Sequence, residues 1–384
     1  MKTIRKAALA GAILATASLL AACTSDGGGT TPPADDDPII AGILLPATGP
    51  NGPGGDRMTA GIKIAVDELN ANGGVLGRQI ELTAADDEGT AAVAVSRAQE
   101  LISQDIDVVF GGLASATALA AQPIFARAGI TDIVITASAD DVLADTVNPD
   151  AVRLNSDSKL SAGAIADFVN DEGFQRIVVL QQNDAYGESQ GQSTISQLDV
   201  APLEVITFDP KQTEFRVEIE KALSNDPDVV VMVNATADTG GPAMVQQLRA
   251  AGYDGPFTMA PTTFSIQAIE LSGPAADGGV SAQAYLADKE PFVSYPGTKF
   301  LTEKYQAETG ELPNHEVAFG YTAVKVWAAA AEAAKDLTRG PLIAQMRGHS
   351  FDGTPFGTVS FDERGQMSST LQLYRVENGE IVTF

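Results

Sequence analysis

Short apolar, β-branched runs alternate with helical segments through most of this chain of 384 residues. Such alternation favours a parallel sheet covered by crossover helices on both faces. A first series predicts strands at 39–45, 79–83, 107–110 and 132–135, with helices at 57–72, 90–104 and 118–128 and a Gly/Pro loop at 48–56. A second series predicts helices at 160–170, 187–198, 214–224 and 241–251, with strands at 176–180, 205–208, 228–233 and 257–259. The sequence therefore predicts an α/β fold with two units in tandem.

The pattern changes after residue 278. We expect strands at 279–285, 357–361, 371–376 and 380–384, and helices at 300–307 and 318–334. Asn378-Gly379 is a favoured two-residue hairpin turn, so the last two strands should be antiparallel. Trp327 lies among Ala and Val in the second helix, which indicates a packing role.

The stretch DVVFGGLASATALAAQ, from Asp107 to Gln122, carries the first candidate site. A buried strand is followed by Gly111 and Gly112, then by Ser115 and Thr117, and then by a helix. Ligands of open α/β sheets bind beyond the carboxyl ends of the strands, and a helix N-terminus attracts carboxylates and other polar oxygens. We therefore expect a ligand here. The alternative is that Ser115 only caps the helix.

Charge and motifs exclude several functions. The chain has 24 Lys and Arg against 50 Asp and Glu, a net charge of −26, which argues against nucleic acid or an anionic membrane surface as a partner. Neither G-x-G-x-x-G after the first strand, nor G-x-x-x-x-G-K-[ST], nor G-x-S-x-G occurs, and no base–nucleophile pair stands out. We therefore expect no enzyme activity and no cofactor.

Metal binding is not expected either. His315-Glu316 lacks the second His of a zinc protease helix, and we expect His315 at the surface near a helix start. The acidic run at 86–88 is interpreted as a solvated strand end.

The N-terminus resembles an export signal. Lys2, Arg5 and Lys6 precede an apolar segment at 7–20, and Leu20-Ala21-Ala22-Cys23 resembles the lipobox of bacterial lipoproteins. Cys23 is the single cysteine of the chain, so no intrachain disulfide can form. We expect a signal peptide at 1–22, a lipidated Cys23, and a flexible tether at 23–38. This places the protein in the cell envelope, anchored on the periplasmic or extracytoplasmic face of a bacterial membrane.

Several segments together resemble the leucine/isoleucine/valine-type periplasmic binding proteins of ABC transporters. They are GIKIAVDELNANGGVLGRQIEL at 61–82, VVFGGLASATALAAQPIF at 108–125, RLNSDSKLSAGAIADFV at 153–169, NDAYGES at 183–189, QQLRAAGYDGP at 246–256 and PFGTVSFDERGQ at 355–366. The resemblance implies the type I binding-protein fold, with two Rossmann-like lobes joined by a three-crossover hinge and a ligand between them. One lobe would comprise 39–155 and 286–350, and the other 156–285 and 351–384.

The resemblance also implies ligand contacts. Ser115 matches the serine that binds the ligand carboxylate, and Tyr186 matches a tyrosine of the cleft. The loop after the fourth strand, commonly Ser-Pro-x-Ala-Thr, is here Thr136 to Asp140. The full candidate set is Ser115, Thr117, Ser138, Ala139, Asp140, Tyr186, Ala235, Asp238 and Thr262.

Three positions depart from the family pattern. Asp140 replaces the threonine, Thr262 replaces the acid that holds the amine of amino-acid ligands, and Gly54 lies where some members have an aromatic residue. The cation-holding role has then moved to Asp140, or the ligand is uncharged and polar. Alternatively, Asp140 caps residues 141–143 and does not contact the ligand.

Two classes of function remain. The first is a monomeric receptor that delivers an amino acid or a related small polar solute to the permease of an ABC importer. The second is a lipoprotein of the same fold that regulates cell-envelope enzymes by protein contact. Hydroxyl side chains at the expected cleft favour the first.

Replacing the lipidation site tests the anchor. Cys23→Ala should release the protein from the membrane fraction, because the signal and the lipobox-like segment are the features that predict attachment. Fractionation of expressing cells measures this. A variant that stays in the membrane fraction as the wild type does would contradict it.

Overall fold

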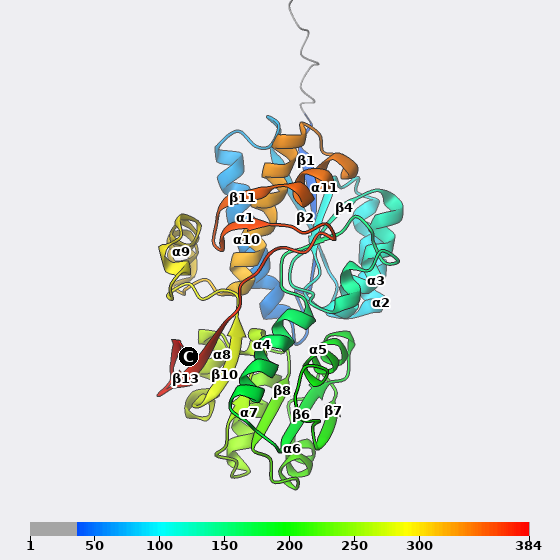
Figure 1. Ribbon diagram of the computed structural model, residues 1–384. Helices are drawn as coiled ribbons and strands as arrows, with labels where there is room; N and C mark the ends of the chain where they lie inside the picture. Colours follow the sequence, from blue (N-terminus) through cyan, green and yellow to red (C-terminus); the bar gives the residue numbers. More distant parts are fainter. Residues whose placement is uncertain (1–36, 384) are drawn as a thin grey trace, which may run out of the picture. The chain divides into compact units, whose positions relative to one another are not determined.

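The computed structural model describes residues 37–383, which form two large sheets flanked by helices (Figure 1). The predicted signal peptide, Cys23 and almost all of the tether lie outside the described residues. The first sheet has the order β2-β1-β3-β4-β5 and is wholly parallel. Its strands are β1 Ile39–Leu45, β2 Ile80–Asp86, β3 Val108–Gly111, β4 Thr131–Val134 and β5 Val152–Arg153. This confirms the predicted α/β class for the first series.

The second sheet has the order β14-β13-β10-β9-β8-β6-β7. Its strands are β6 Ile177–Gln182, β7 Glu204–Phe208, β8 Val229–Val233, β9 Phe257–Thr258, β10 Gly279–Gln283, β13 Gln372–Glu377 and β14 Glu380–Thr383. Only β13 and β14 are antiparallel to their neighbours. The hairpin at Asn378 and Gly379 is confirmed, since both residues have the positive φ of 54° and 81° that a type I′ turn needs.

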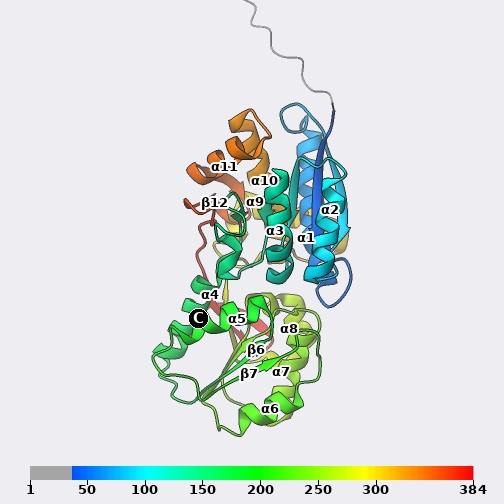
Figure 2. The same cartoon turned by 90° about the vertical axis from the view of Figure 1, so that its right-hand side faces the viewer.

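Helices cover both faces of each sheet. They are α1 Gly52–Ala71, α2 Ala91–Ile102, α3 Ser115–Ala128, α4 Ser158–Asp171, α5 Ala185–Ile195, α6 Arg216–Leu223, α7 Gly240–Ala250, α8 Ile266–Ser272, α9 Pro296–Thr309, α10 His315–Ala334 and α11 Arg339–Gly348. In the first sheet, the side chains of β1 point alternately to the two faces. One set packs in the core with α1 and α10, and the other in the core with α2 and α3. Figure 2 turns the face with α2 and α3 toward the viewer. No helix within residues 37–383 is long and apolar enough to cross a membrane.

The chain passes between the two sheets three times, as the resemblance implied. The crossings follow β5, follow β10, and precede β13 (Figure 1). The third crossing lies later than expected. We assigned 351–384 to the second lobe, but β11 Ser350–Thr354 and β12 Gly357–Ser360 pair with each other, and Phe351 and Val359 are buried in the core that contains α10. Their apolar side chains complete that core, and this packing partner is invisible in the local sequence.

Helix α1 begins at Gly52, although we expected a loop up to residue 56. A Cβ atom at Gly55 would lie 1.8 Å from the carbonyl oxygen of Pro46, so glycine lets the helix start against the end of β1. Pro53 stands in the first turn, where its missing N–H has no helical partner to lose. Tertiary packing has therefore overridden the weak helical propensity of glycine. Helices α8 and α11 were not predicted.

The helices α1 and α10 approach each other through two glycines. A Cβ atom at Gly61 would lie 2.1 Å from the carbonyl oxygen of Val317, and one at Gly320 would lie 2.2 Å from that of Met58. Further along, Glu68 accepts a hydrogen bond from the Tyr321 hydroxyl at 2.6 Å and pairs with Lys325 at 2.9 Å. On the sheet side of α10, Trp327 is fully buried edge-to-face against Phe110, which confirms its packing role. The two helices are thus fixed in register.

Adding a methyl group at this contact tests the packing. Gly61→Ala should lower the free energy of unfolding by about 1–3 kcal/mol, because the backbone of α10 must move away. Gly340→Ala is the control, since no atom lies within 4 Å of its added Cβ atom, and alanine should be neutral or stabilising there. Urea unfolding of both variants measures this. Equal effects of the two substitutions would contradict the close contact.

Candidate functional site

The turn between β3 and α3 presents the start of a helix at the carboxyl edge of the first sheet. Gly112 takes a left-handed φ of 74°, which glycine adopts without strain. Ser115 is the first residue of α3, and the capping position belongs to Ala114 without a side-chain hydrogen bond. Ser115 Oγ instead accepts a hydrogen bond from the Ala139 N–H at 3.2 Å. Its hydroxyl proton is therefore free to be donated, and the interpretation of Ser115 as a mere cap is wrong.

A cavity lies at this helix start and is lined by residues that follow strands of both sheets. Its volume of about 110 Å³ is several times the roughly 10–15 Å³ that one water molecule needs, so a small solute fits. Six of the nine candidate residues line it: Ser115, Ser138, Tyr186, Ala235, Asp238 and Thr262. The position agrees with the rule that ligands of open α/β sheets bind beyond the carboxyl ends of the strands.

The other three candidates lie behind or beside the cavity. Thr117 donates its hydroxyl to the Ala114 carbonyl at 3.0 Å, and the N–H of Ala139 holds Ser115. Asp140 is exposed and begins the short 3-10 helix η1 Asp140–Leu143, without a side-chain capping bond. Its carboxylate accepts bonds from the Lys159 N–H at 3.4 Å and the Ser193 hydroxyl at 3.2 Å. The Asp140 side chain therefore contacts α4 and α5, outside the cavity wall.

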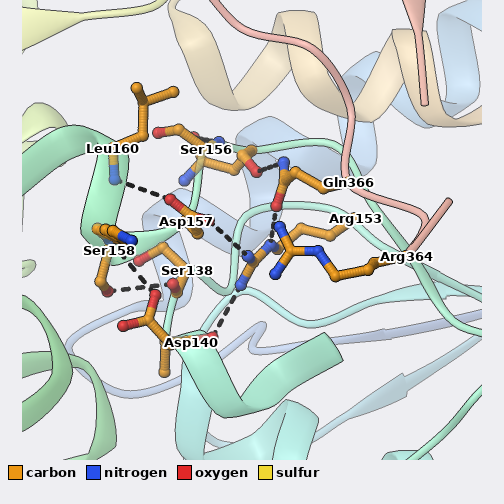
Figure 3. A network of polar contacts seen from close by, with 12 residues as sticks. Ser138, Asp140, Arg153, Ser156, Asp157, Ser158, Leu160, Arg364 and Gln366 are labelled. Atoms are coloured by element: carbon orange, nitrogen blue, oxygen red, sulfur yellow. Dashed lines mark hydrogen bonds and ion pairs between the residues drawn. The ribbon is translucent and has the colours of Figure 1, made fainter. Parts of the chain in front are cut away.

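A buried arginine that the sequence reasoning missed supports this loop (Figure 3). Arg153 in β5 is 1% exposed; its Nη1 donates to the Ala139 carbonyl at 2.8 Å and its Nε to Gln366 at 2.7 Å. Asp157, 4.0 Å away in the first crossing, also caps α4 by accepting from the Leu160 N–H. Burial lowers the pKa of Arg153 to about 10, so it stays charged at neutral pH. Arg153 thus joins two of the three crossings to the wall of the cavity.

A second arginine links the two sheets directly. Arg57 of α1 pairs with Glu316 of α10 and donates two hydrogen bonds, at 2.7 and 3.2 Å, to Asp238 in the loop that follows β8 of the second sheet. Burial lowers the pKa of Arg57, but Glu316 and Asp238 outweigh burial and raise it above its usual value. Burial raises the pKa of Glu316, but the positive charge of Arg57 and the hydrogen bonds from Arg57 and Asn314 outweigh burial and lower it below its usual value, so Glu316 is ionised at neutral pH. The sequence analysis included Asp238 among the candidate residues, but it did not predict the roles of Arg57 and Glu316.

His315 begins α10 as expected, but it is not a surface residue. It is 7% exposed, it lines the cavity, and its Nε2 has no hydrogen-bond partner among the described residues. Its ring packs edge-to-face on Phe319. Burial lowers the pKa of His315, so the imidazole is neutral at pH 7. The fold buries it because the first turn of α10 faces the cavity.

The lining favours non-covalent recognition of a small polar molecule. Hydroxyls and amides contribute, and burial raises the pKa of Tyr186, which keeps its hydroxyl protonated as a donor. The charged side chains of the wall are Glu88, Asp184, Asp238, Glu316 and Lys211, so carboxylates predominate. No group of three or more His, Cys, Asp or Glu suited to a metal occurs within residues 37–383.

Comparison with known proteins identifies the family. The model of a family described as periplasmic binding protein matches residues 38–380, so the chain belongs to this family. The resemblance found in the sequence is thereby confirmed at the level of family and fold. Membership of a periplasmic family implies an extracytoplasmic location.

Individual relatives are distant but span nearly the whole chain. The Leu/Ile/Val-binding protein BraC3 of Rhizobium johnstonii is 24% identical over 90% of this chain and 93% of its own length. The Streptococcus pneumoniae substrate-binding protein LivJ, solved with isoleucine, has a TM-score of 0.80 at 23% identity, covering 90% of this chain and 97% of its own. An R. palustris solute-binding protein solved with benzoate has a TM-score of 0.82 at 23% identity, covering 90% and 95%. At these identities the solved structures establish the shared fold.

The buried His315 should give the protein a measurable pH dependence. The native pKa lies below the unfolded value of about 6.5, so the stability contributed by neutral His315 is present above about pH 6.5 and is lost as the pH falls through the native pKa. The stability advantage of the wild type over His315→Gln should therefore shrink between about pH 7.5 and about pH 5, by up to about 2 kcal/mol.

Urea unfolding at both pH values measures this difference. The control is His349→Gln, which removes the exposed imidazole at the end of α11 and no buried one. An advantage of wild type over His315→Gln that does not change with pH would contradict the assignment of His315 as a buried neutral side chain.

Proposed function

We propose that this protein is a lipid-anchored extracytoplasmic receptor that delivers a small, amino-acid-like polar solute to the permease of an ABC importer. The observation that carries the proposal is the cavity at the carboxyl edges of both sheets, with Ser115 and the start of α3 in its wall. Unpaired N–H groups at a helix start and a free hydroxyl proton suit a carboxylate. The protein acts by binding and release, as a monomer, with no cofactor.

The comparisons support a carboxylate-bearing solute. One similar structure was solved in complex with isoleucine and another in complex with benzoate, and both molecules carry a carboxylate. In this chain the start of α3 offers the matching anion-binding group. The importer as partner and Cys23 as the anchor are inferred from the family and from the lipobox-like segment.

The arrangement of the two sheets supports release by opening. Cavity residues come from both sheets, and three chain crossings connect them. Hinge motion about such crossings is a common way to open and close a site. The contact of Arg57 with Asp238 is the ion pair that would part when the sheets separate.

Solute binding can be measured directly. Thermal shift and calorimetry with the L-amino acids and benzoate should identify at least one binder. Ser115→Ala should weaken the affinity for that solute by about ten- to hundredfold, because a hydrogen bond to a buried charged group contributes about 1.5–3 kcal/mol.

Ser196→Ala is the matched control, since this serine is exposed at the end of α5, away from the cavity, and should leave affinity unchanged. The proposal fails if no member of the panel binds. It also fails if Ser115→Ala and Ser196→Ala bind the solute equally well. Insensitivity to every solute, together with recovery of a cell-wall synthase from envelope extracts, would indicate the regulatory function instead.

A further inference from the structure

The cavity has no acid at Thr262, where the family pattern has one, and none at Asp140, which the sequence suggested as its replacement. Thr262 lines the cavity and its hydroxyl has no hydrogen-bond partner among the described residues. Asp140 is directed to α4 and α5, where its carboxylate already accepts two hydrogen bonds. A solute with a protonated amine would need its counterion from another element of the wall.

Glu316 supplies a carboxylate with one oxygen to spare. Its Oε2 accepts hydrogen bonds from Arg57 Nε and from Asn314 Nδ2 at 3.1 Å. Its Oε1 accepts none from the described residues. Glu316 lines the cavity and its side chain is largely buried, so Oε1 is an accessible acceptor in the cavity wall that the neighbours of Oε2 hold in place. A carboxylate oxygen of a cavity wall that accepts no hydrogen bond from the protein is available to a donor on a ligand, and a hydrogen bond to such a charged group is among the stronger ones.

Gly54 explains how this oxygen reaches the cavity. A Cβ atom at Gly54 would lie 2.7 Å from Glu316 Oε1 and 3.2 Å from Leu113 Cδ1. Glycine at position 54 therefore leaves the space that the carboxylate uses. Because Leu113 belongs to the turn that leads into α3, Glu316 Oε1 lies near the anion-binding start of that helix. An acceptor for a cation and a site for an anion are thus neighbours.

The charges around Arg57 also favour a solute that carries a positive charge. Arg57 carries one positive charge and contacts two carboxylates, those of Glu316 and Asp238. The triad is therefore one negative charge in excess, in a largely buried setting. Lys211, the one lysine of the cavity wall, is exposed and forms no ion pair with the described residues. A cationic group on the solute would balance the triad.

We propose that Glu316 Oε1 binds a protonated amine of the solute, while Ser115 and the start of α3 bind its carboxylate. This inference rests on the proposed function and narrows it to zwitterionic solutes of the amino-acid type, over plain carboxylates such as benzoate. Glu316 is then a specificity-determining residue on helix α10, placed by Arg57, Asn314 and Gly54.

The test compares two ligands that differ by one group. The probes are the L-amino acid that binds the wild type most tightly and the carboxylic acid that lacks only its amine; for leucine this is 4-methylpentanoic acid. Calorimetry on wild type should show the amino acid bound at least about tenfold more tightly. Glu316→Gln should weaken the amino acid by about ten- to hundredfold and leave the affinity for the deaminated acid unchanged or higher.

Two further variants separate this role from a loss of structure. Gly54→Ala keeps every charge but places a methyl group against Oε1, so it should also weaken the amino acid more than the deaminated acid. Glu308→Gln removes an exposed carboxylate of α9, away from the cavity, and it should change neither affinity. Retained binding of the deaminated acid shows that each variant is folded.

The outcomes distinguish the two proposals. If benzoate or a deaminated acid binds the wild type as tightly as any amino acid, the protein is a solute receptor but the assignment of Glu316 is wrong. If Glu316→Gln weakens both probes equally, or neither, the assignment is likewise overturned. If nothing in the panel binds, the receptor function itself fails.

Discussion

The close contact of α1 with α10 is the constraint on which the site depends. Gly61 and Gly320 each stand where a side chain would collide with the backbone of the opposite helix, so the helices meet at a fixed register. That register brings Arg57 of α1 against Glu316 of α10. Because a buried charge must be paired, this contact also draws Asp238 from the second sheet. Backbone packing therefore determines the electrostatics of the cavity.

A second buried arginine performs a different task. Among the described residues Arg153 forms one ion pair, with Asp157 at 4.0 Å, and its hydrogen bonds go to neutral oxygens of Ala139 and Gln366. These partners belong to the cavity loop and to two of the chain crossings (Figure 3). A planar guanidinium with several donors suits such a junction, since one group can orient several segments. The loop at 136–140, whose Ala139 N–H donates to Ser115, is thereby connected to the segments that join the two sheets.

The sequence predicted most of the repeating α/β pattern and the candidate turn at Ser115. It succeeded where a signal is local, as with the apolar strand before Gly111 or the hairpin at Asn378-Gly379. It failed where long-range packing decides. The sequence around the first turn of α1 is typical of a loop, and only the contact of Gly55 with Pro46 explains why it is helical. Likewise, the sequence predicted His315 at the surface, but the first turn of α10 faces the cavity.

The sequence by itself determined the class of fold, the family and the candidate helix start at Ser115, because periodicity, glycine turns and ordered motifs lie in neighbouring residues. Only the tertiary structure decided which charges meet at the cavity. Along the chain, Arg57 is 181 positions from Asp238 and 259 positions from Glu316, so no local pattern links the three residues. Side-chain electrostatics acts over a few ångströms, and only folding brings such residues within that range.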